Sequence, residues 1–401
     1  MAINLEAIKL NHDSTSATHD ALNIRRDATT FVDVPEWRRG VSVNPEDSPA
    51  AYSIGDAGHN QLTIQAQFSV TRDAPRSVDI RAVDPTVDPP GQSGCIGWFL
   101  RLIAIIIRAL FGNVLGEVQA QTVTLPPAGG TTPFITFRLI NGRLGSSGVG
   151  IRTTTWRWQY RRSGTSSWTD FATSTHRVYV VLATPTAPWQ QQPYASSNTQ
   201  LPWTSALDQA CSWAVLKTDR VSASSAVTRA VNDLGPSRIR YDCPGGGSTH
   251  YGGDLTAIID RIRGGVGRGQ YVNCSDCATF TSTFANVLGC DLWQSQMGWG
   301  FGLNAGLAIG WPTWEPTFPG GFNYHEVAWT GACDRADRVY DACLEVDGDA
   351  DPTSAPHTAL LPVNMVFGSP GTGQSLDKLV PPATRAACVP QTYTRQRRPV
   401  Y

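Results

Sequence analysis

Hydrophobic and polar residues alternate in short runs over the first half of the chain. Residues 61–70 and 77–83 alternate strictly, as strands with one buried face do. Further runs of this kind are separated by Gly, Pro, Asn and Ser, and they cover residues 117–125, 133–140, 149–160 and 175–182. Strands at this spacing predict an all-β domain over residues 51–184, a β-sandwich of immunoglobulin-like architecture.

Two segments of this half depart from the strand pattern. Residues 1–50 are polar with few apolar runs, which predicts an extended N-terminal arm. An insertion at 95–112 contains an apolar run, residues 98–111, whose only charged side chains are Arg101 and Arg108. A run this short, with two arginines, does not span a bilayer. We therefore expect a helix that packs inside the molecule, or that contacts a protein partner or a membrane surface.

The second half changes to helical spacing after a segment rich in Pro and Gln. That segment, residues 185–202, predicts a linker between two domains. Apolar residues then recur on one helical face over residues 206–216, 226–234 and 255–262. Helices followed by strands predict an α+β papain-like domain over residues 203–383. Residues 384–401 are polar and basic, which predicts a solvated tail.

A fourth helix is predicted directly after Asn273, and it places a cysteine at a helix N-terminus. Asn273 is a good N-cap, and Asp276 occupies the position of a capping-box partner. Gly289 fits the position that stops the helix. Cys274 would be the first helical residue, where free N–H groups and the helix dipole stabilise a thiolate. Cys277, one turn later among apolar neighbours, has the pattern of a buried structural cysteine.

A nucleophilic thiolate needs a base, and the base needs an orienting group. Residues 321–329 alternate like a strand and contain His325. Residues 338–346 form a second strand-like run, which contains Asp341. Two neighbouring strands packed against the helix would place the imidazole beside the sulfur and the carboxylate beside the imidazole. We therefore expect Cys274, His325 and Asp341 to form a catalytic triad.

These three segments resemble the transglutaminase-like superfamily. Residues 274–289 are similar to its nucleophile helix, which reads Cys-x-Asp-x-Ala and ends in Leu-Gly. Residues 325–329 are similar to its His strand and residues 339–341 to its Asp strand, although the usual His-x-Trp and Asp-Pro-Thr are replaced by His-Glu-Val and Asp-Ala-Cys. The resemblance covers about residues 203–361. It implies a thiol-dependent acyl transfer on protein or peptide amides.

In the chemistry that this resemblance implies, Cys274 attacks an amide carbonyl and His325 protonates the leaving amine, while Asp341 fixes the imidazole. The Cys274 backbone N–H supplies one oxyanion donor, and Tyr241 or a tryptophan is a candidate for the second. Water as acceptor gives a cysteine protease or deamidase, and an amine gives a transglutaminase. The competing hypothesis is a structural or adaptor component of a larger assembly with a catalytically silent domain.

The composition and the N-terminal residues limit which partners and which cellular compartment we expect. The chain has 401 residues and a formal net charge of −1, which gives no argument for nucleic acid as partner. No basic and then apolar stretch opens the sequence, so we expect a cytoplasmic protein, or an effector exported by a route that needs no N-terminal signal peptide. The nine cysteines allow one nucleophile and four disulfides, but the lack of a signal favours reduced thiols.

Other motifs are weaker candidates for ligand sites. The C-x-x-C at 274–277 lacks a second pair at zinc-ribbon spacing. The D-x-D-x-D at 347–351 lacks the Gly and Glu of a calcium loop. We therefore expect neither a metal nor a cofactor. Aromatic residues between the nucleophile helix and His325 either line an acyl-donor cleft or pack twisted strands: Trp293, Trp299, Trp311, Trp314 and Phe318.

Overall fold

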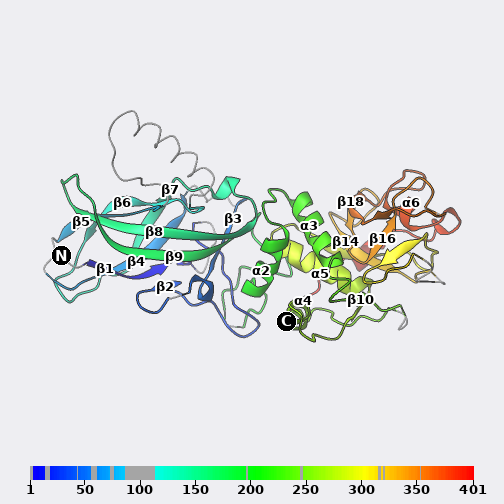
Figure 1. Cartoon of the computed structure of the whole chain (residues 1–401), viewed down its shortest axis with the longest axis horizontal. Helices are drawn as coiled ribbons and strands as arrows, with labels where there is room; N and C mark the ends of the chain where they lie inside the picture. The colour runs from blue at the N-terminus through cyan, green and yellow to red at the C-terminus, as the bar shows by residue number, and fades with distance from the viewer. Residues whose placement is uncertain are drawn as a thin grey trace, which may run out of the picture. The chain divides into compact units, whose positions relative to one another are not determined.

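The chain is a mixed α+β protein in which sheets dominate and helices are few (Figure 1). It divides into two compact units: the first comprises Met1–Arg26, Thr30–Thr184 and Gln191–Ser196, and the second Asp27–Thr29, Pro185–Gln190 and Ser197–Tyr401. The structure, a computed structural model, describes residues 3–13, 19–42, 44–55, 61–72, 76–85, 113–195, 197–243, 247–314, 318, 321–352 and 354–401.

The first unit is built on one curled sheet with the strand order β2-β1-β4-β7-β6-β5-β8-β9-β3 (Figure 1). Neighbouring strands are antiparallel, except that β3 runs parallel to β9. Every second residue of β4 is buried, and Trp156 and Trp158 are completely buried in the same core. The strands are β1 (Ile3–Lys9), β2 (Trp37–Arg38), β3 (Ala50–Ser53), β4 (Thr63–Val70), β5 (Ser77–Val83), β6 (Glu117–Thr124), β7 (Ile135–Ile140), β8 (Gly150–Arg162) and β9 (Thr169–Val181).

Among the described residues of 51–184 the regular elements are strands, apart from the short helix at 144–146, but the strands form one hydrogen-bonded sheet instead of the two sheets of a sandwich. The prediction of an extended arm over residues 1–50 was wrong. Strand β1 pairs with β4 and buries Ile3, Leu5 and Ile8 in the core. A β-bulge shifts the register between Leu5 and Ala7, which interrupts the alternation that would have revealed this strand.

The apolar insertion at 95–112, with its run 98–111, lies outside the described residues. Within the residues that the structure does describe, no helix is long and apolar enough to cross a membrane.

The second unit places its main helices before most of its strands. Helices α2 (Thr204–Trp213), α3 (Arg220–Asn232), α4 (Leu255–Ile262) and α5 (Cys274–Val287) come first, and the short α6 (Ser375–Leu379) follows the strands. Every residue of α5 is buried, because α2, α3 and β14 all pack against this helix. Short 3₁₀ helices occur in both units, at η1 (Pro45–Asp47), η3 (Leu144–Ser146), η4 (Pro382–Thr384) and η5 (Thr392–Thr394).

Three small sheets complete the second unit. One has the order β12-β14-β15-β18, another the order β13-β16-β17, and β10 pairs with β11. The buried helix α5 lies against the first of these sheets through β14 and β12. The strands are β10 (Arg240–Tyr241), β11 (Tyr271–Val272), β12 (Trp293–Met297), β13 (Gly306–Ala308), β14 (His325–Trp329), β15 (Arg338–Tyr340), β16 (Leu344–Asp347), β17 (Ala359–Leu360) and β18 (Val363–Val366).

The segment predicted as a linker, residues 185–202, is partly packed. Trp189 is buried, and its indole N–H donates to the carbonyl of Thr283 in α5 at 2.8 Å. The Asn286 amide, also on α5, donates to the carbonyl of Ala187 at 2.8 Å. A segment whose composition is typical of a free linker is therefore held in place by one large buried side chain and by hydrogen bonds from side chains to backbone carbonyls.

The prediction of a solvated tail over residues 384–401 was also wrong. Gln294 of β12 and Gln396 exchange two backbone hydrogen bonds of 2.9 Å, so the tail adds to the edge of that sheet. Arg395 and Arg397 lie over the ring of Trp293. Basic residues that look solvated in the sequence are thus engaged by an aromatic face and by the buried groups described below.

Candidate functional site

Helix α5 begins at Cys274, as predicted. The Asn273 side chain accepts the backbone N–H of Asp276 at 2.9 Å, and the Asp276 carboxylate accepts the backbone N–H of Asn273 at 3.2 Å. This reciprocal pair is a capping box. Gly289 follows the helix with φ 83°, the left-handed conformation expected there. The capped N-terminus therefore presents Cys274 where the helix dipole favours an anion.

Asp276 has a second role that the sequence did not reveal. Its carboxylate also accepts the backbone N–H groups of His250, Tyr251 and Gly252, at 2.9 to 3.1 Å. The Asn273 amide in turn donates to the carbonyl of Gly247 at 2.7 Å. The loop before α4 is therefore fixed against the first turn of α5 by the same two residues that cap the helix.

The structure brings His325 and Asp341 into direct contact. Strands β14 and β15 are antiparallel neighbours, with His325 at the start of β14 and Asp341 directly after β15. His325 Nε2 lies 2.6 Å from Asp341 Oδ2, and both side chains are buried. Asp341 Oδ1 accepts the backbone N–H groups of Cys343 at 2.8 Å and Leu344 at 3.3 Å. Both carboxylate oxygens are therefore fixed, and so is the imidazole.

The same hydrogen bonds explain why the prediction of a single strand over residues 338–346 was wrong. The chain forms two strands, β15 and β16, and they are separated at Asp341. An Asp side chain that binds N–H groups two and three residues later favours a turn over a continuing strand. The break thus follows from the carboxylate that orients His325.

The imidazole of His325 is held in its charged form. Burial opposes protonation, but the Asp341 carboxylate and then the Cys274 side chain raise the pKa of His325 to about 10. Nδ1 is buried and makes no hydrogen bond of regular geometry within the described part of the chain. Because Asp341 occupies Nε2, Nδ1 is the ring nitrogen that remains for the neighbouring Cys274 side chain. The ring of Phe322 stacks on the imidazole, with centroids 5.0 Å apart and planes at 15°.

Two tyrosines lie near Cys274. Burial, and then the proximity of Cys274, raise the pKa of Tyr241, so its hydroxyl remains a hydrogen-bond donor. Burial also raises the pKa of Tyr324, which hydrogen bonds to Ser275 and lies near Cys274. Tyr241 was a candidate from the sequence, whereas Tyr324 was missed. Its position next to His325 was the available signal.

Glu326, the strand neighbour of His325, bonds to other groups than the Asp341 carboxylate, in keeping with the alternation of side chains along a strand. It accepts the hydroxyl of Ser275 and forms an ion pair of 2.8 Å with Arg398. No signal in the sequence pointed to Arg398, because the pair joins residues far apart in the chain.

The aromatic residues before His325 mostly pack against neighbours. The Trp311 indole donates to the carbonyl of Tyr241 at 2.9 Å, and Trp314 lies against the ring of His357. Trp299 differs, because it is 56% exposed and lies 6.3 Å from the ring of Tyr324. Of the two hypotheses for this stretch, packing explains Trp293, Trp311 and Trp314, and only Trp299 has the exposure that a substrate contact needs.

The remaining cysteines have less reactive surroundings. All eight cysteines of the described chain are free thiols. Burial raises the pKa of Cys243 to about 11, and that of Cys290, Cys333 and Cys388 to about 12. Burial also raises the pKa of Cys343. For Cys277, a hydrogen bond with Cys343 lowers the pKa of the thiol, but burial and nearby carboxylates outweigh this effect and raise the pKa.

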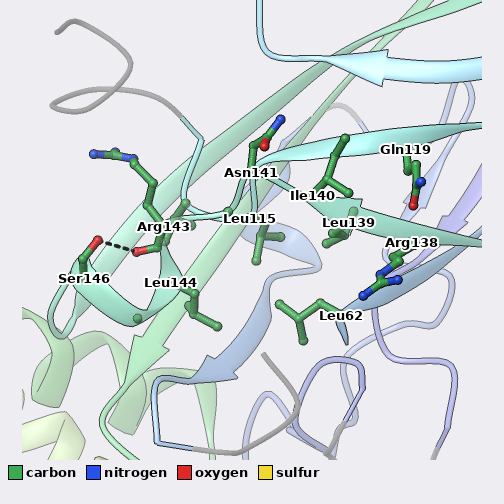
Figure 2. A pocket seen from close by; sticks show the side chains of 13 residues that line it. Leu62, Leu115, Gln119, Arg138, Leu139, Ile140, Asn141, Arg143, Leu144 and Ser146 are labelled. Atoms are coloured by element: carbon green, nitrogen blue, oxygen red, sulfur yellow. Dashed lines mark hydrogen bonds between the residues drawn. The ribbon is translucent and has the colours of Figure 1, made fainter. Parts of the chain in front are cut away.

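Other features do not add to this site. Within the described ranges, no group of three or more His, Cys, Asp and Glu side chains could hold a metal ion. Asp347, the first carboxylate of the D-x-D-x-D motif, bonds to His357 and to backbone N–H groups. A cavity of about 580 Å³ lies in the first unit, with Leu62, Leu115 and Leu139 along its wall (Figure 2). It shares no residue with the cysteine site.

Comparison with known proteins gives no family: no family model matches the chain, and no curated protein matches it either. The function must therefore be inferred from the geometry of the site.

Proposed function

We propose that the second unit is a papain-like, transglutaminase-like domain that catalyses thiol-dependent acyl transfer on protein or peptide amides. One observation carries the proposal: His325 is fixed by Asp341 at 2.6 Å through Nε2, which leaves Nδ1 for Cys274, a neighbour of the imidazole at a capped helix N-terminus. A thiol, an imidazole and a carboxylate in this order are what nucleophilic catalysis by cysteine needs.

The first half-reaction forms a thioester. It starts from an ion pair, in which the proton of the Cys274 thiol lies on His325 Nδ1 and Asp341 stabilises the imidazolium. The thiolate attacks the amide carbonyl, and the tetrahedral oxyanion is bound by the Cys274 backbone N–H and by the Tyr241 hydroxyl. The intermediate collapses when the imidazolium donates its proton to the leaving nitrogen. An amine or ammonia departs, and the acyl group stays on sulfur.

The second half-reaction regenerates the thiol. His325, now neutral, takes a proton from the acceptor as the acceptor attacks the thioester carbonyl. Water yields a carboxylic acid, and a primary amine yields a new amide. The thiolate leaves and recovers its ion pair with the imidazolium. Cys274 is 4% exposed and His325 is fully buried, so the acceptor must enter a site that is largely closed to solvent.

The test is an activity screen on the purified protein. Glutamine-containing peptides are incubated with and without a fluorescent primary amine, and amine incorporation, ammonia release and new N-termini are measured. We expect one of these activities in the wild type, its loss in Cys274→Ala, and its retention in Cys277→Ala, a matched control one turn along the same helix. Activity that survives in Cys274→Ala would contradict the proposal, and inactivity in all assays would favour a structural or adaptor role.

A further inference from the structure

Arg398 connects the tail of the chain to the first turn of the nucleophile helix. Its Nη2 lies 2.8 Å and 2.9 Å from the two carboxylate oxygens of Glu326. Its Nη1 donates to the carbonyl of Ser275 at 3.3 Å and to the Thr279 hydroxyl at 3.0 Å. The same nitrogen also donates to the side-chain oxygen of Gln294. One guanidinium thus joins α5, β12 and β14.

The partner of Arg398 is a carboxylate that needs compensation. The Glu326 side chain has no exposed surface, and a lone ionised carboxylate in such a place is strongly disfavoured. Glu326 follows His325 in β14 and accepts the hydroxyl of Ser275, the residue after Cys274. Its negative charge is therefore close to the position where a thiolate forms, and it would oppose that thiolate if it were not neutralised.

We propose that Arg398 is a positioning residue of the thiolate site, which neutralises Glu326 and holds the first turn of α5 against β12 and β14. A thiolate at Cys274 then meets no uncompensated negative charge on this side of the helix. The inference rests on the proposed function, because it assigns Arg398 a role in forming the nucleophile.

Other groups around Cys274 also affect its ionisation, and Arg398 acts in addition to them. The Asp276 and Asp341 carboxylates are each bound by backbone N–H groups, and Asp341 is paired with His325. The loop residue His250 is bonded to Asp242 at 2.9 Å. The remaining titratable neighbours lie in α5, in β10, directly before β14 and directly before β16: Cys277, Tyr241, Tyr324 and Cys343. Arg398 is the group that compensates Glu326.

The experiment measures the rate constant for alkylation of Cys274 by iodoacetamide from pH 4 to pH 10, read by mass spectrometry of the Cys274 peptide in the full chain. In Arg398→Gln the pH midpoint should rise by roughly one unit, the effect of a unit charge on the order of 10 Å away at an effective dielectric constant of about 20. Arg398→Lys keeps the charge and should stay near the wild type. The double variant Glu326→Gln/Arg398→Gln removes both charges and should return the pH midpoint to near the wild-type value.

Two further measurements distinguish an electrostatic role of Arg398 from a purely structural one. Glu326→Gln alone leaves Arg398 uncompensated and should lower the midpoint, which provides a test if Arg398→Gln does not fold. Urea unfolding separates stability from reactivity, since both Gln variants of Arg398 should lose stability. A midpoint unchanged in Arg398→Gln and Glu326→Gln, with stability lost, would reduce Arg398 to a purely structural residue. A wild type in which Cys274 shows no titration at all would instead overturn the proposed function.

Discussion

Replacing Asp341 by Asn keeps the shape of the side chain but removes its charge, and the structure shows why the amide is a poor substitute. Oδ2 contacts His325 Nε2, while Oδ1 accepts the N–H groups of Cys343 and Leu344. An Asn side chain offers one acceptor and one donor group. If the Asn NH₂ group faces the backbone, it meets the N–H groups of Cys343 and Leu344, and all of these groups are donors. If it faces His325, Nε2 must become an acceptor and the ring proton moves to Nδ1, the nitrogen that should accept from the thiol.

The size of the effect follows from the pKa of His325. Burial alone would lower it, and the Asp341 carboxylate is the main group that raises it, from 6.5 to about 10. The rise corresponds to a preference for the imidazolium on the order of 5 kcal/mol at about 1.4 kcal/mol per unit. Without Asp341 the pKa should fall to 6.5 or below. At pH 7 the imidazolium population then falls from nearly complete to less than roughly a quarter.

The assay follows His325 and Cys274 together. NMR titration of the imidazole nitrogens gives the pKa of His325, and iodoacetamide alkylation at pH 7 gives the reactivity of Cys274. We expect the alkylation rate of Asp341→Asn to fall at least about fourfold, in proportion to the imidazolium population. Catalytic activity should fall too, but less than in His325→Ala, which removes the base itself.

The chain offers a matched control. Asp347 binds His357 Nδ1 at 2.7 Å and accepts two backbone N–H groups, so Asp347→Asn breaks a pair of the same kind. It should also lose stability, yet leave the alkylation rate of Cys274 unchanged. If the His325 titration is the same in Asp341→Asn and wild type, or if the two Asn variants slow Cys274 alkylation equally, Asp341 does not act on Cys274 through His325.

The remaining predictions concern the helix and the pH dependence of folding. Cys277→Ala should cost roughly 1–2 kcal/mol of stability, since it removes a buried sulfur, and should retain activity; a chemical role for this thiol is indicated if activity is lost. Asn273→Ala removes the cap of α5 and should cost about 1 kcal/mol and slow alkylation of Cys274, as measured by urea unfolding and labelling. The pKa of His325 is raised by folding, so its contribution to stability is complete below about pH 6.5 and is lost as pH rises through about 10. The difference in unfolding free energy between wild type and His325→Gln should therefore be smaller at pH 9.5 than at pH 7. An equal difference at the two pH values would contradict this.

Local signals in the sequence predicted helix α5 well. A capping residue, a partner three positions later and a terminal glycine all lie within one segment, and α5 begins at Cys274 as they indicate. The strand of His325 was recognisable for the same reason, since alternation is a property of neighbouring residues.

The features that were missed depend on distant parts of the chain or on irregular backbone. Arg398 reaches Glu326 across 72 positions, and nothing near either residue signals the pair. Strand β1 was hidden by a bulge at Leu5, and the end of β15 is set by hydrogen bonds from Asp341. Trp189 anchors a segment whose Pro and Gln content is typical of a linker. In each case tertiary contacts override the composition of the segment.

Whether Cys274 is a thiolate nucleophile is decided by labelling the whole set of nine cysteines in the wild-type protein with iodoacetamide at pH 6. Burial raises the pKa of several competing thiols to about 11 or 12, so they should be almost unreactive at this pH. We expect the peptide containing Cys274 to be alkylated well ahead of all others. Equal labelling of several cysteines, or labelling of Cys274 only in alkaline solution, would contradict it.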